Sequence, residues 1–294
     1  MSSSLTLITG ATGFVGRHLL DELDGAVPLR CLVRDGGDLS ARPGVEVVAG
    51  DVSNRDDLAR ALDGVDCAYY LVHSMETGGD DEFAERDRRL ATNMADAARD
   101  AGVRRVIYLG GIDADGDSSE HLDSRHEVQD ILAGFGGEFV ALRAAMIVGA
   151  GSASFDALAE IVGRLPVLAL PTWRDRLCQP IAVRDVISAL AACRTVVPGS
   201  YDVGGPDRLT FAAMTTQIAE LQGRTPRSFD LPFSNSRVEG AAAALITGQD
   251  RELLTPLMAG LDADLVVDHN ALHTVFGLEP TPFAEAAAHA LEAA

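Results

Sequence analysis

Leu5-Thr6-Leu7-Ile8-Thr9-Gly10-Ala11-Thr12-Gly13-Phe14-Val15-Gly16 is the segment that decides the fold of this chain. It begins as a mostly apolar, β-prone run, which is typical of a strand buried in a parallel sheet. Gly10 permits a tight turn, Gly13 lets the backbone approach a phosphate because it has no Cβ, and Gly16 lets the next helix pack against the strand. A helix over residues 14–23 then points its N-terminal amides at that phosphate. The segment therefore predicts a dinucleotide-binding turn, with an ordinary glycine-rich turn as the alternative.

Predicted strands and helices alternate along the first half of the chain. Strands are expected near residues 5–9, 29–33, 45–49, 67–72, 105–109 and 138–142, with a long helix near residues 81–101. This alternation predicts an α/β fold with a doubly wound parallel sheet of the Rossmann type. Residues 149–176 break the pattern, and residues 209–294 favour a smaller, mostly helical C-terminal lobe. We therefore divide the chain into a nucleotide-binding core, residues 1–149 plus about 178–204, and a substrate or partner lobe, residues about 150–177 and 205–294.

The composition fits an enzyme-sized α/β protein. A chain of 294 residues can bury a sizeable core, and its apolar runs are too short to span a bilayer. Met1-Ser2-Ser3-Ser4 leads directly into the first strand, so we expect no signal peptide. The cysteines Cys31, Cys67, Cys178 and Cys193 lack metal-like spacing, and the first two fall in predicted buried strands. We therefore expect a cytoplasmic protein with no membrane span and no metal site.

The charge balance is strongly acidic. The chain has 44 acidic residues, 29 of them aspartate, against 24 basic residues that are all arginine, which gives a net charge of −20. Such a charge destabilises a compact state by self-repulsion unless salt screens it. We interpret the surface as halophilic, adapted to a salt-rich cytoplasm; the alternative is a GC-rich genome that favours arginine over lysine. No basic patch stands out, so nucleic acid is not an expected partner.

The glycine segment resembles the start of the extended and atypical short-chain dehydrogenase/reductase families, because its spacing is Gly-x-x-Gly-x-x-Gly. Further matches follow in the family's order up to about residue 220: Gly50-Asp51-Val52, residues 69–75, Asn93, residues 102–108, 143–149, 179–186 and 201–206. The resemblance is greatest to the atypical NAD(P)H-binding proteins, a group that includes the NmrA-like regulators. It implies that Asp51 contacts the adenine and that residues 69–75 form the end of the fourth strand, beside the cofactor.

The end of the second predicted strand bears on the choice of cofactor. An acidic residue there would bind the adenosine ribose and reject a 2′-phosphate, whereas Arg34 can pair with that phosphate and Arg17 can add a second charge. Asp35 is an alternative ribose ligand, and Arg34 can equally be a solvated loop charge. We expect NADP(H) to be preferred over NAD(H). The predicted cofactor residues are Thr9, Gly10, Thr12, Gly13, Phe14, Val15, Gly16, Arg34, Asp51, Val52, Leu71 and Val72.

The resemblance makes the reaction harder to assign than the cofactor. Active members use a Tyr-x-x-x-Lys pair, in which the lysine lowers the tyrosine pKa. This chain has no lysine. The nearest analogue is His121 and Arg125, four residues apart on one predicted helix. His121 could donate a proton and Arg125 could bind a ribose hydroxyl or phosphate, although arginine does not readily release a proton. Alternatively, both are surface residues with structural roles.

Other candidate residues lie at strand ends, where open parallel sheets bind ligands. His73 and Ser74 follow the fourth strand and are alternative catalytic groups, or else a loop pair bonded to the backbone. Gly110 and Gly111 stand where family members carry a hydroxyl that steadies the substrate oxygen. Trp173 lies in the irregular segment, where it lines a cleft or anchors the lobe. The predicted substrate-cleft residues are Met75, Gly110, Gly111, Arg143 and Trp173.

Two functions fit these observations. The first is an NADP-dependent oxidoreductase acting on a small hydrophobic carbonyl, enone or quinone, since such acceptors need hydride placement more than a Tyr-Lys pair. The second is a non-catalytic NAD(P)H-binding protein that senses a redox ratio or supports an assembly, and the absent pair favours it. The fold also allows a sugar-nucleotide epimerase or dehydratase, but that chemistry relies on the same missing pair. The sequence identifies a small-molecule substrate only by class, and it leaves partners and oligomeric state open.

Overall fold

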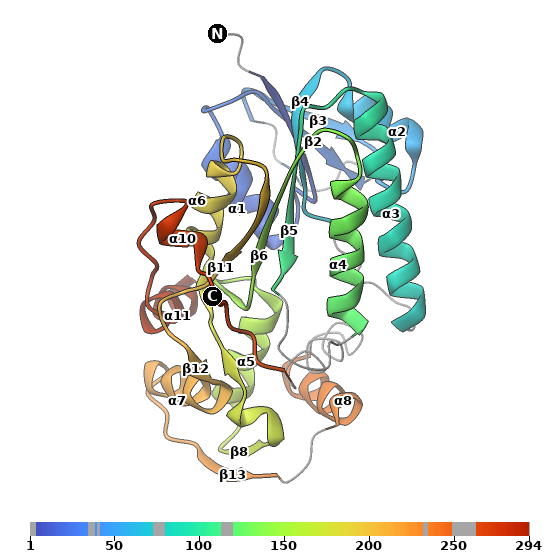
Figure 1. Ribbon diagram of the computed structural model, residues 1–294. Coiled ribbons are helices and arrows are strands. Elements are labelled where there is room, and N and C mark those ends of the chain that lie inside the picture. The colour runs from blue at the N-terminus through green and yellow to red at the C-terminus, as the bar shows by residue number, and fades with distance from the viewer. Residues whose placement is uncertain are drawn as a thin grey trace.

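The computed structural model describes residues 4–34, 39, 42–72, 80–112, 120–231, 235–248 and 263–293. Its centre is a seven-stranded sheet in the order β11-β6-β5-β4-β1-β2-β3, in which all the pairings are parallel (Figure 1). This confirms the predicted doubly wound α/β fold. The strands are β1 (Leu5–Thr9), β2 (Leu29–Val33), β3 (Val45–Ala49), β4 (Val65–Tyr70), β5 (Arg105–Gly111), β6 (Glu138–Ala144) and β11 (Gly199–Val203).

Helices cover both faces of the sheet. α1 (Phe14–Leu23) and α6 (Val183–Ala192) pack on one face, and α2 (Arg55–Leu62), α3 (Asp80–Asp100) and α4 (Glu120–Ala133) pack on the other (Figure 1). Neighbouring strand residues point to opposite faces, as the two-residue period of a strand requires. Ile8 thus joins the cluster under α1 and α6, whereas Leu7 joins the cluster under α2, α3 and α4. Cys31 and Cys67 are fully buried, as predicted.

The C-terminal region is mostly helical and has an apolar core of its own. Its helices are α5 (Ala153–Arg164), α7 (Phe211–Leu221), α8 (Ser236–Thr247) and α11 (Phe283–Ala293), with the 3-10 helix η2 (Thr172–Asp175). The short helix α10 (Ala271–Thr274) instead packs on the central sheet, in the cluster beneath α1 and α6. The short strands pair as β8 (Val167–Leu170) with β13 (Arg227–Asp230), β7 (Ile147–Val148) with β10 (Ile181–Ala182), and β9 (Leu177–Cys178) with β12 (Leu209–Thr210). Within the described ranges, no helix has the length and apolar character needed to cross a bilayer.

The predicted break at residues 149–176 is wrong in its detail, because this segment contains α5 and β8. Gly151 and Pro166 lie on either side of α5 and do not interrupt it. The helix forms because Phe155, Ala159 and Val162 follow the helical spacing and bury one stripe in the core of the C-terminal region. This region lies below the carboxyl ends of the central strands in Figure 1, so it covers the edge where the sheet reverses its strand order between β1 and β4.

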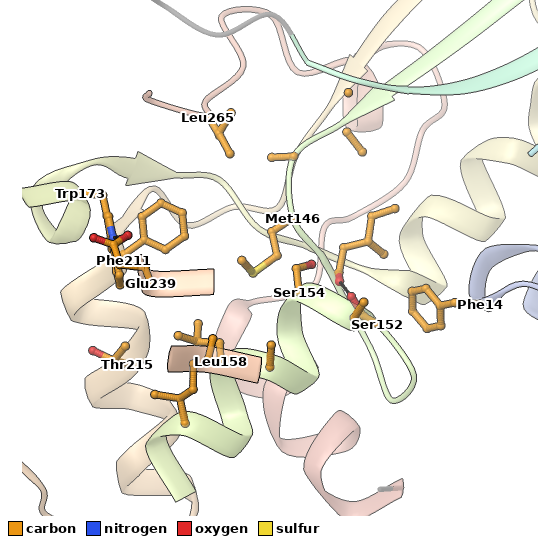
Figure 2. Close-up of a pocket in the computed structure, with 18 of the residues that line it drawn as sticks. Phe14, Met146, Ser152, Ser154, Leu158, Trp173, Phe211, Thr215, Glu239 and Leu265 are labelled. Atoms are coloured by element: carbon orange, nitrogen blue, oxygen red, sulfur yellow. Dashed lines mark hydrogen bonds between the residues drawn. The ribbon is translucent and has the colours of Figure 1, made fainter. Parts of the chain in front are cut away.

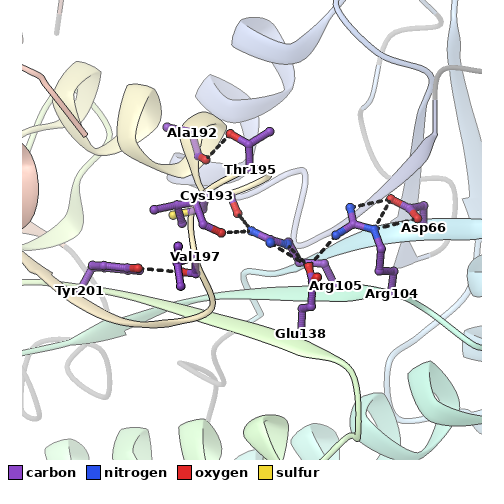
Figure 3. A network of polar contacts seen from close by, with 10 residues as sticks. Asp66, Arg104, Arg105, Glu138, Ala192, Cys193, Thr195, Val197 and Tyr201 are labelled. Carbon is purple, nitrogen blue, oxygen red and sulfur yellow. Dashed lines mark hydrogen bonds and ion pairs between the residues drawn. The ribbon is translucent and has the colours of Figure 1, made fainter. Parts of the chain in front are cut away.

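A network of arginines and carboxylates joins the strands at the opposite, amino-terminal edge (Figure 3). Arg105 is buried, and its Nη1 donates to the carbonyl oxygens of Cys193 at 2.6 Å and Val196 at 2.7 Å. Its Nε donates to Glu138 Oε2 at 2.9 Å, so the side chain ties the end of α6 to β5 and β6. Arg104 is about half exposed and pairs with Asp66 and Glu138. Within this network, Arg105 is therefore the residue that supplies hydrogen bonds to backbone carbonyl groups beneath the surface.

We expect Arg105→Ala to lower the free energy of unfolding by about 2–4 kcal/mol, because it leaves buried carbonyls without donors. Arg104→Ala, the matched control, should cost about 0–1 kcal/mol because its side chain is exposed. Urea unfolding of both variants measures the difference, and equal losses would contradict this assignment.

Hydrogen bonds from Arg104 to Asp66 and from Arg105 to Glu138 hold both carboxyl pKa values below their usual range. The contribution of these two ion pairs to the free energy of unfolding is therefore present at neutral pH and is lost as the pH falls below about 4.

Candidate cofactor and substrate site

The glycine segment forms a closely packed turn between β1 and α1. Gly10 has a φ of +77°, and a Cβ built on it would lie 2.7 Å from the carbonyl oxygen of Leu71. A Cβ on Gly16 would lie 2.1 Å from the carbonyl oxygen of Gly10, so α1 starts in backbone contact with the turn. Gly13 is the N-cap of α1 and has no side chain to cap the first-turn amides. The turn therefore fits a pyrophosphate, which would accept hydrogen bonds from these amides.

The loop after β3 forms a second part of the site. The backbone N–H of Ser53 donates to Asp51 Oδ1 at 2.6 Å, and Asn93 of α3 donates to the carbonyl oxygen of Ser53 at 3.1 Å. Burial opposes ionisation of Asp51, but the bonds from Ser53 and the charges of Arg34 and Arg86 hold its pKa below the usual value. Arg34 follows β2 directly and acts electrostatically on Asp51. The structure therefore brings these two predicted cofactor residues into one neighbourhood.

A cavity of about 1160 Å³ begins at the glycine turn and extends into the C-terminal region. In Figure 2, Phe14 lies at one end and Trp173 with Phe211 at the other, while Ser152, Ser154 and Met146 lie between them. The walls are predominantly apolar. The described lining residues from the sheet side are Gly10, Gly13, Phe14, Val15, Gly16, Leu71, Leu109, Gly110, Gly111, Ile112, Arg125, Ala144, Ala145, Met146 and Ile147. The rest come from α5, β8, η2, α7, α8 and their flanks, together with Leu231 after β13 and Leu265.

Two charged side chains, Arg125 and Glu239, occur among the described residues of the cavity wall. Glu239 Oε2 accepts a hydrogen bond from Trp173 Nε1 at 2.9 Å, and its Oε1 accepts one from the backbone N–H of Asn235 at 2.9 Å. Trp173 also packs edge-to-face on Phe211, with ring centroids 5.8 Å apart. Glu239 therefore joins α8 to η2 and holds the indole in the wall of the cavity.

Comparisons with known proteins agree with this geometry. A family model described as NAD(P)H-binding matches residues 10–145. The chain is 31% identical over 254 residues to the (4-alkanoyl-5-oxo-2,5-dihydrofuran-3-yl)methyl phosphate reductase of Streptomyces griseus, which covers 82% of this chain and 80% of that protein. The chain belongs to the atypical, NmrA-like, NAD(P)H-binding group of short-chain dehydrogenases/reductases.

Two further proteins illustrate the range of this group. The ceramide reductase of Caulobacter vibrioides is 29% identical over 289 residues, covering 95% of this chain and 87% of that protein. The solved structure of an Escherichia coli NADPH-dependent quinone oxidoreductase complexed with NADPH has a TM-score of 0.77 and 23% identity, covering 97% of this chain and 99% of that one. The last likeness is one of fold alone.

The cofactor residues predicted for this short-chain dehydrogenase/reductase fall into three groups. Gly10, Gly13, Phe14, Val15, Gly16 and Leu71 line the cavity. Arg34, Asp51, Val52 and Val72 lie outside its wall, at or after the ends of β2, β3 and β4. Thr9 is buried and donates to the carbonyl oxygen of Tyr69 at 3.0 Å, while Thr12 is partly buried in the turn. Their roles toward the cofactor stay predictions.

The predicted catalytic and cleft residues are only partly brought together. Arg125 lines the cavity with Gly110 and Gly111, and its carbonyl oxygen accepts from the buried Tyr108 hydroxyl at 3.4 Å. Trp173 also lines it. Arg143 is not among the described lining residues; its Nε donates to Asp202 Oδ1 at 2.6 Å on the neighbouring strand β11. His73, Ser74, Met75 and the side chain of His121 lie outside the described residues.

Sequence reasoning missed most of the cavity wall. The missed residues on α5 include Ala157, Leu158 and Ile161, followed by Leu165 at its C-cap. Their spacing marks a second apolar stripe on a segment that already buries Phe155 and Val162. These two apolar stripes were the sequence signal that could have identified this part of the cavity wall, because a helix that is apolar on two faces contacts protein or ligand on both. Nothing in the sequence indicated that α8 would lie opposite.

Substitutions at two glycines should separate folding from cofactor binding. Gly16→Ala places a methyl group against the Gly10 carbonyl, so we expect severe destabilisation. Gly13→Ala meets only the Gly10 carbonyl oxygen, at 3.3 Å, so the fold should persist while binding of NADPH weakens at least tenfold because the methyl group obstructs the phosphate. Thermal unfolding and fluorescence titration with NADPH measure the two effects. Unchanged NADPH affinity in a folded Gly13→Ala protein would show that the phosphates bind elsewhere.

Proposed function

We propose that this chain is an NADPH-dependent reductase acting on the carbonyl, enone or quinone group of a hydrophobic substrate. The observation that carries the proposal is the single cavity that joins the dinucleotide-binding turn to an apolar chamber in the C-terminal region. When bound, NADPH supplies a hydride. A carbonyl group takes the hydride at its carbon and one proton from water at its oxygen, an enone takes the hydride at its β-carbon and one proton at its α-carbon, and a quinone gains one hydride and one proton in total. The products are then NADP⁺ and an alcohol, a reduced enone or a hydroquinone.

The chain's own residues supply positioning and charge stabilisation in this proposal. Arg125 lies in the wall beside Gly110 and Gly111, at the carboxyl end of β5. Its guanidinium can donate hydrogen bonds to the substrate oxygen as negative charge develops there. Because arginine stays protonated, Arg125 stabilises the charge and does not itself supply the proton. Apolar walls exclude water around the reacting carbon and strengthen this interaction.

The chemistry of the cavity favours a reductase over a sugar-nucleotide epimerase. Sugar hydroxyls need many hydrogen-bonding partners, whereas the wall of the chamber is built mainly from alanine, leucine, isoleucine and aromatic residues. The names of similar proteins support the same choice, since two relatives are called reductases and a structural neighbour is called a quinone oxidoreductase. A non-catalytic NAD(P)H sensor is the second candidate, favoured by the absence of lysine from the chain.

The preference for NADPH rests on Arg34. Its position directly after β2 is the place where a dinucleotide-binding fold distinguishes a ribose hydroxyl from a 2′-phosphate. Its charge acts on Asp51, which the family resemblance places against the adenine. A planar guanidinium can bind a phosphate through two hydrogen bonds, which makes arginine well suited to this role.

We expect Arg34→Ala to weaken NADPH binding by about 10- to 100-fold, the usual value of a hydrogen-bonded charge pair, and to leave NADH within about threefold. Arg104→Ala removes an exposed arginine at the opposite edge of the sheet and is the control. Fluorescence titrations of both nucleotides in molar KCl give the dissociation constants. Equal affinities of the unchanged protein for NADPH and NADH would refute the preference.

Turnover tests the reductase proposal itself. NADPH consumption should be measured with a panel of aldehydes, enones and quinones in molar KCl. We expect Arg125→Gln to lower kcat about 100-fold or more without weakening NADPH binding, because its charge is needed only as the oxygen becomes negative. Arg88→Gln removes an exposed arginine on α3 that pairs with Glu127, and it should leave kcat unchanged. Tight NADPH binding without turnover of any acceptor would favour the non-catalytic candidate.

A further inference from the structure

Two apolar stripes form the long walls of the chamber. On α5 the apolar lining residues include Ala157, Leu158 and Ile161, with Leu165 one turn further on, and Ala153 and Ser154 of its first turn also line the cavity. On α8 they include Val238, Ala242 and Ile246, each one helical turn after the last, and Glu239 and Ala243 also line the cavity. The two helices touch through a small cluster that includes Ala157 and Ala243. Because this contact joins the two helices beside their lining residues, α5 and α8 form two sides of an elongated apolar chamber.

The third side of the chamber is also apolar. Leu168 and Leu170 of β8 are buried and line it, together with Trp173 and Phe211. Figure 2 shows Leu158 and Thr215 near the same end as Trp173, and Phe14 of the glycine turn at the far end. The chamber therefore leads away from the place where the nicotinamide would lie. A substrate whose reacting group sits near Gly110 and Arg125 would extend its remaining part between α5 and α8.

Two of the polar side chains in this part of the wall, Glu239 and Thr215, already have partners within the protein. Both carboxylate oxygens of Glu239 accept hydrogen bonds, from Trp173 and from the backbone of Asn235. Thr215 Oγ1 donates to the carbonyl oxygen of Ala212 at 2.8 Å. A polar ligand would lose hydration here without gaining equivalent bonds, whereas an apolar one would lose nothing. The chamber thus selects for hydrocarbon.

The volume leaves room for more than a small acceptor. Pockets for single small ligands span about 300–1,000 Å³, and this cavity of about 1160 Å³ exceeds that range. A bound cofactor would fill the part beside the glycine turn with its pyrophosphate and the part beside the end of β5 with its nicotinamide. A single-ring substrate would leave the part beside Val238 and Ile246 unfilled, and its wall would forfeit contacts. A flexible chain can follow the space between the two helices.

We propose that the substrate carries a long, unbranched alkyl or acyl chain, which lies in the chamber between α5 and α8 while its oxidised group lies beside Arg125. This inference deepens the proposed function. The reaction assigned to the substrate rests on that function, whereas binding of its alkyl chain in the chamber does not. It identifies the substrate as a lipid-like molecule rather than a compact ring.

Trp173 makes the proposal directly testable. It is the only tryptophan of the chain, it is 8% exposed and it lines the chamber, so its fluorescence reports occupancy without cofactor or turnover. Primary alcohols from hexanol to dodecanol, the products expected from aldehydes, are the probes. We expect the affinity to rise about fourfold for each added methylene until the chamber is full. Equal affinities for hexanol and dodecanol would overturn the proposal.

Substitutions on α8 test where the alkyl chain of the ligand lies. Ala242 is exposed and lines the chamber, so Ala242→Phe should fill part of it and weaken dodecanol binding at least tenfold while changing hexanol binding little. Leu245→Phe is the matched control, because Leu245 is 88% exposed on the same helix and is not a lining residue. If Ala242→Phe fails to fold, Ile246→Gln replaces it and should weaken all chains by placing an amide in the wall. A control that weakens dodecanol as much as Ala242→Phe would contradict the placement.

The outcomes distinguish this inference from the proposed function. Binding that strengthens with chain length supports the chamber as a chain site, whether or not aldehydes are reduced. Reduction of short aldehydes and of menadione at equal efficiency, with no dependence on chain length in binding or in KM, would retain the reductase and overturn the chain site. A dependence of KM on aldehyde length that parallels the alcohol affinities supports both.

Discussion

The contact between Gly16 and the carbonyl of Gly10 is the constraint on which the rest of the site depends. No side chain fits between the first turn of α1 and the loop that precedes it, because even a Cβ would lie 2.1 Å from that oxygen. The contact fixes the direction in which α1 leaves the sheet and therefore where its N-terminal amides point. A Cβ on Gly10 would likewise lie too close to the carbonyl oxygen of Leu71, so the ends of β1 and β4 are also in close backbone contact. The place where a cofactor can bind follows from these backbone contacts.

The two edges of the sheet are built from different interactions. At the amino-terminal edge, arginines and carboxylates join strand starts and the end of α6, and Arg105 satisfies carbonyls that water does not reach. At the carboxyl-terminal edge, β5 ends in Gly110 and Gly111 and β6 ends in Ala144, and these three residues line the cavity. Polar connections thus stabilise the amino-terminal edge, whereas charged pairs at the opposite edge, such as Arg34 with Asp51 and Arg143 with Asp202, lie outside the described wall of the cavity. This division explains how a chain of net charge −20 encloses an apolar chamber.

Sequence patterns within single segments predicted the strands of the sheet. The chamber depends on contacts between segments that lie far apart in the sequence, and no pattern indicated those. Gly10, Gly13 and Gly16 act within one turn, so their role was evident from spacing, and β1, β2 and β3 begin and end as predicted. Arg143 was assigned to the cleft because it ends β6, but its pairing with Asp202 depends on β11 being the neighbouring strand. The wall formed by α8 depends on a contact between Ala157 and Ala243, far apart in sequence. Only the three-dimensional arrangement shows such contacts.

The chamber wall and the central sheet belong to separate apolar clusters. The residues of α5 and α8 that meet at Ala157 and Ala243 share no cluster with those beneath α1 or α3. A substitution in the wall therefore changes the shape of the chamber while leaving the packing that orients the glycine turn unaltered. Natural selection can thus alter what the protein accepts, one wall residue at a time, without rebuilding the part that holds the nucleotide. Relatives in this group can diverge in substrate while retaining one inherited redox framework.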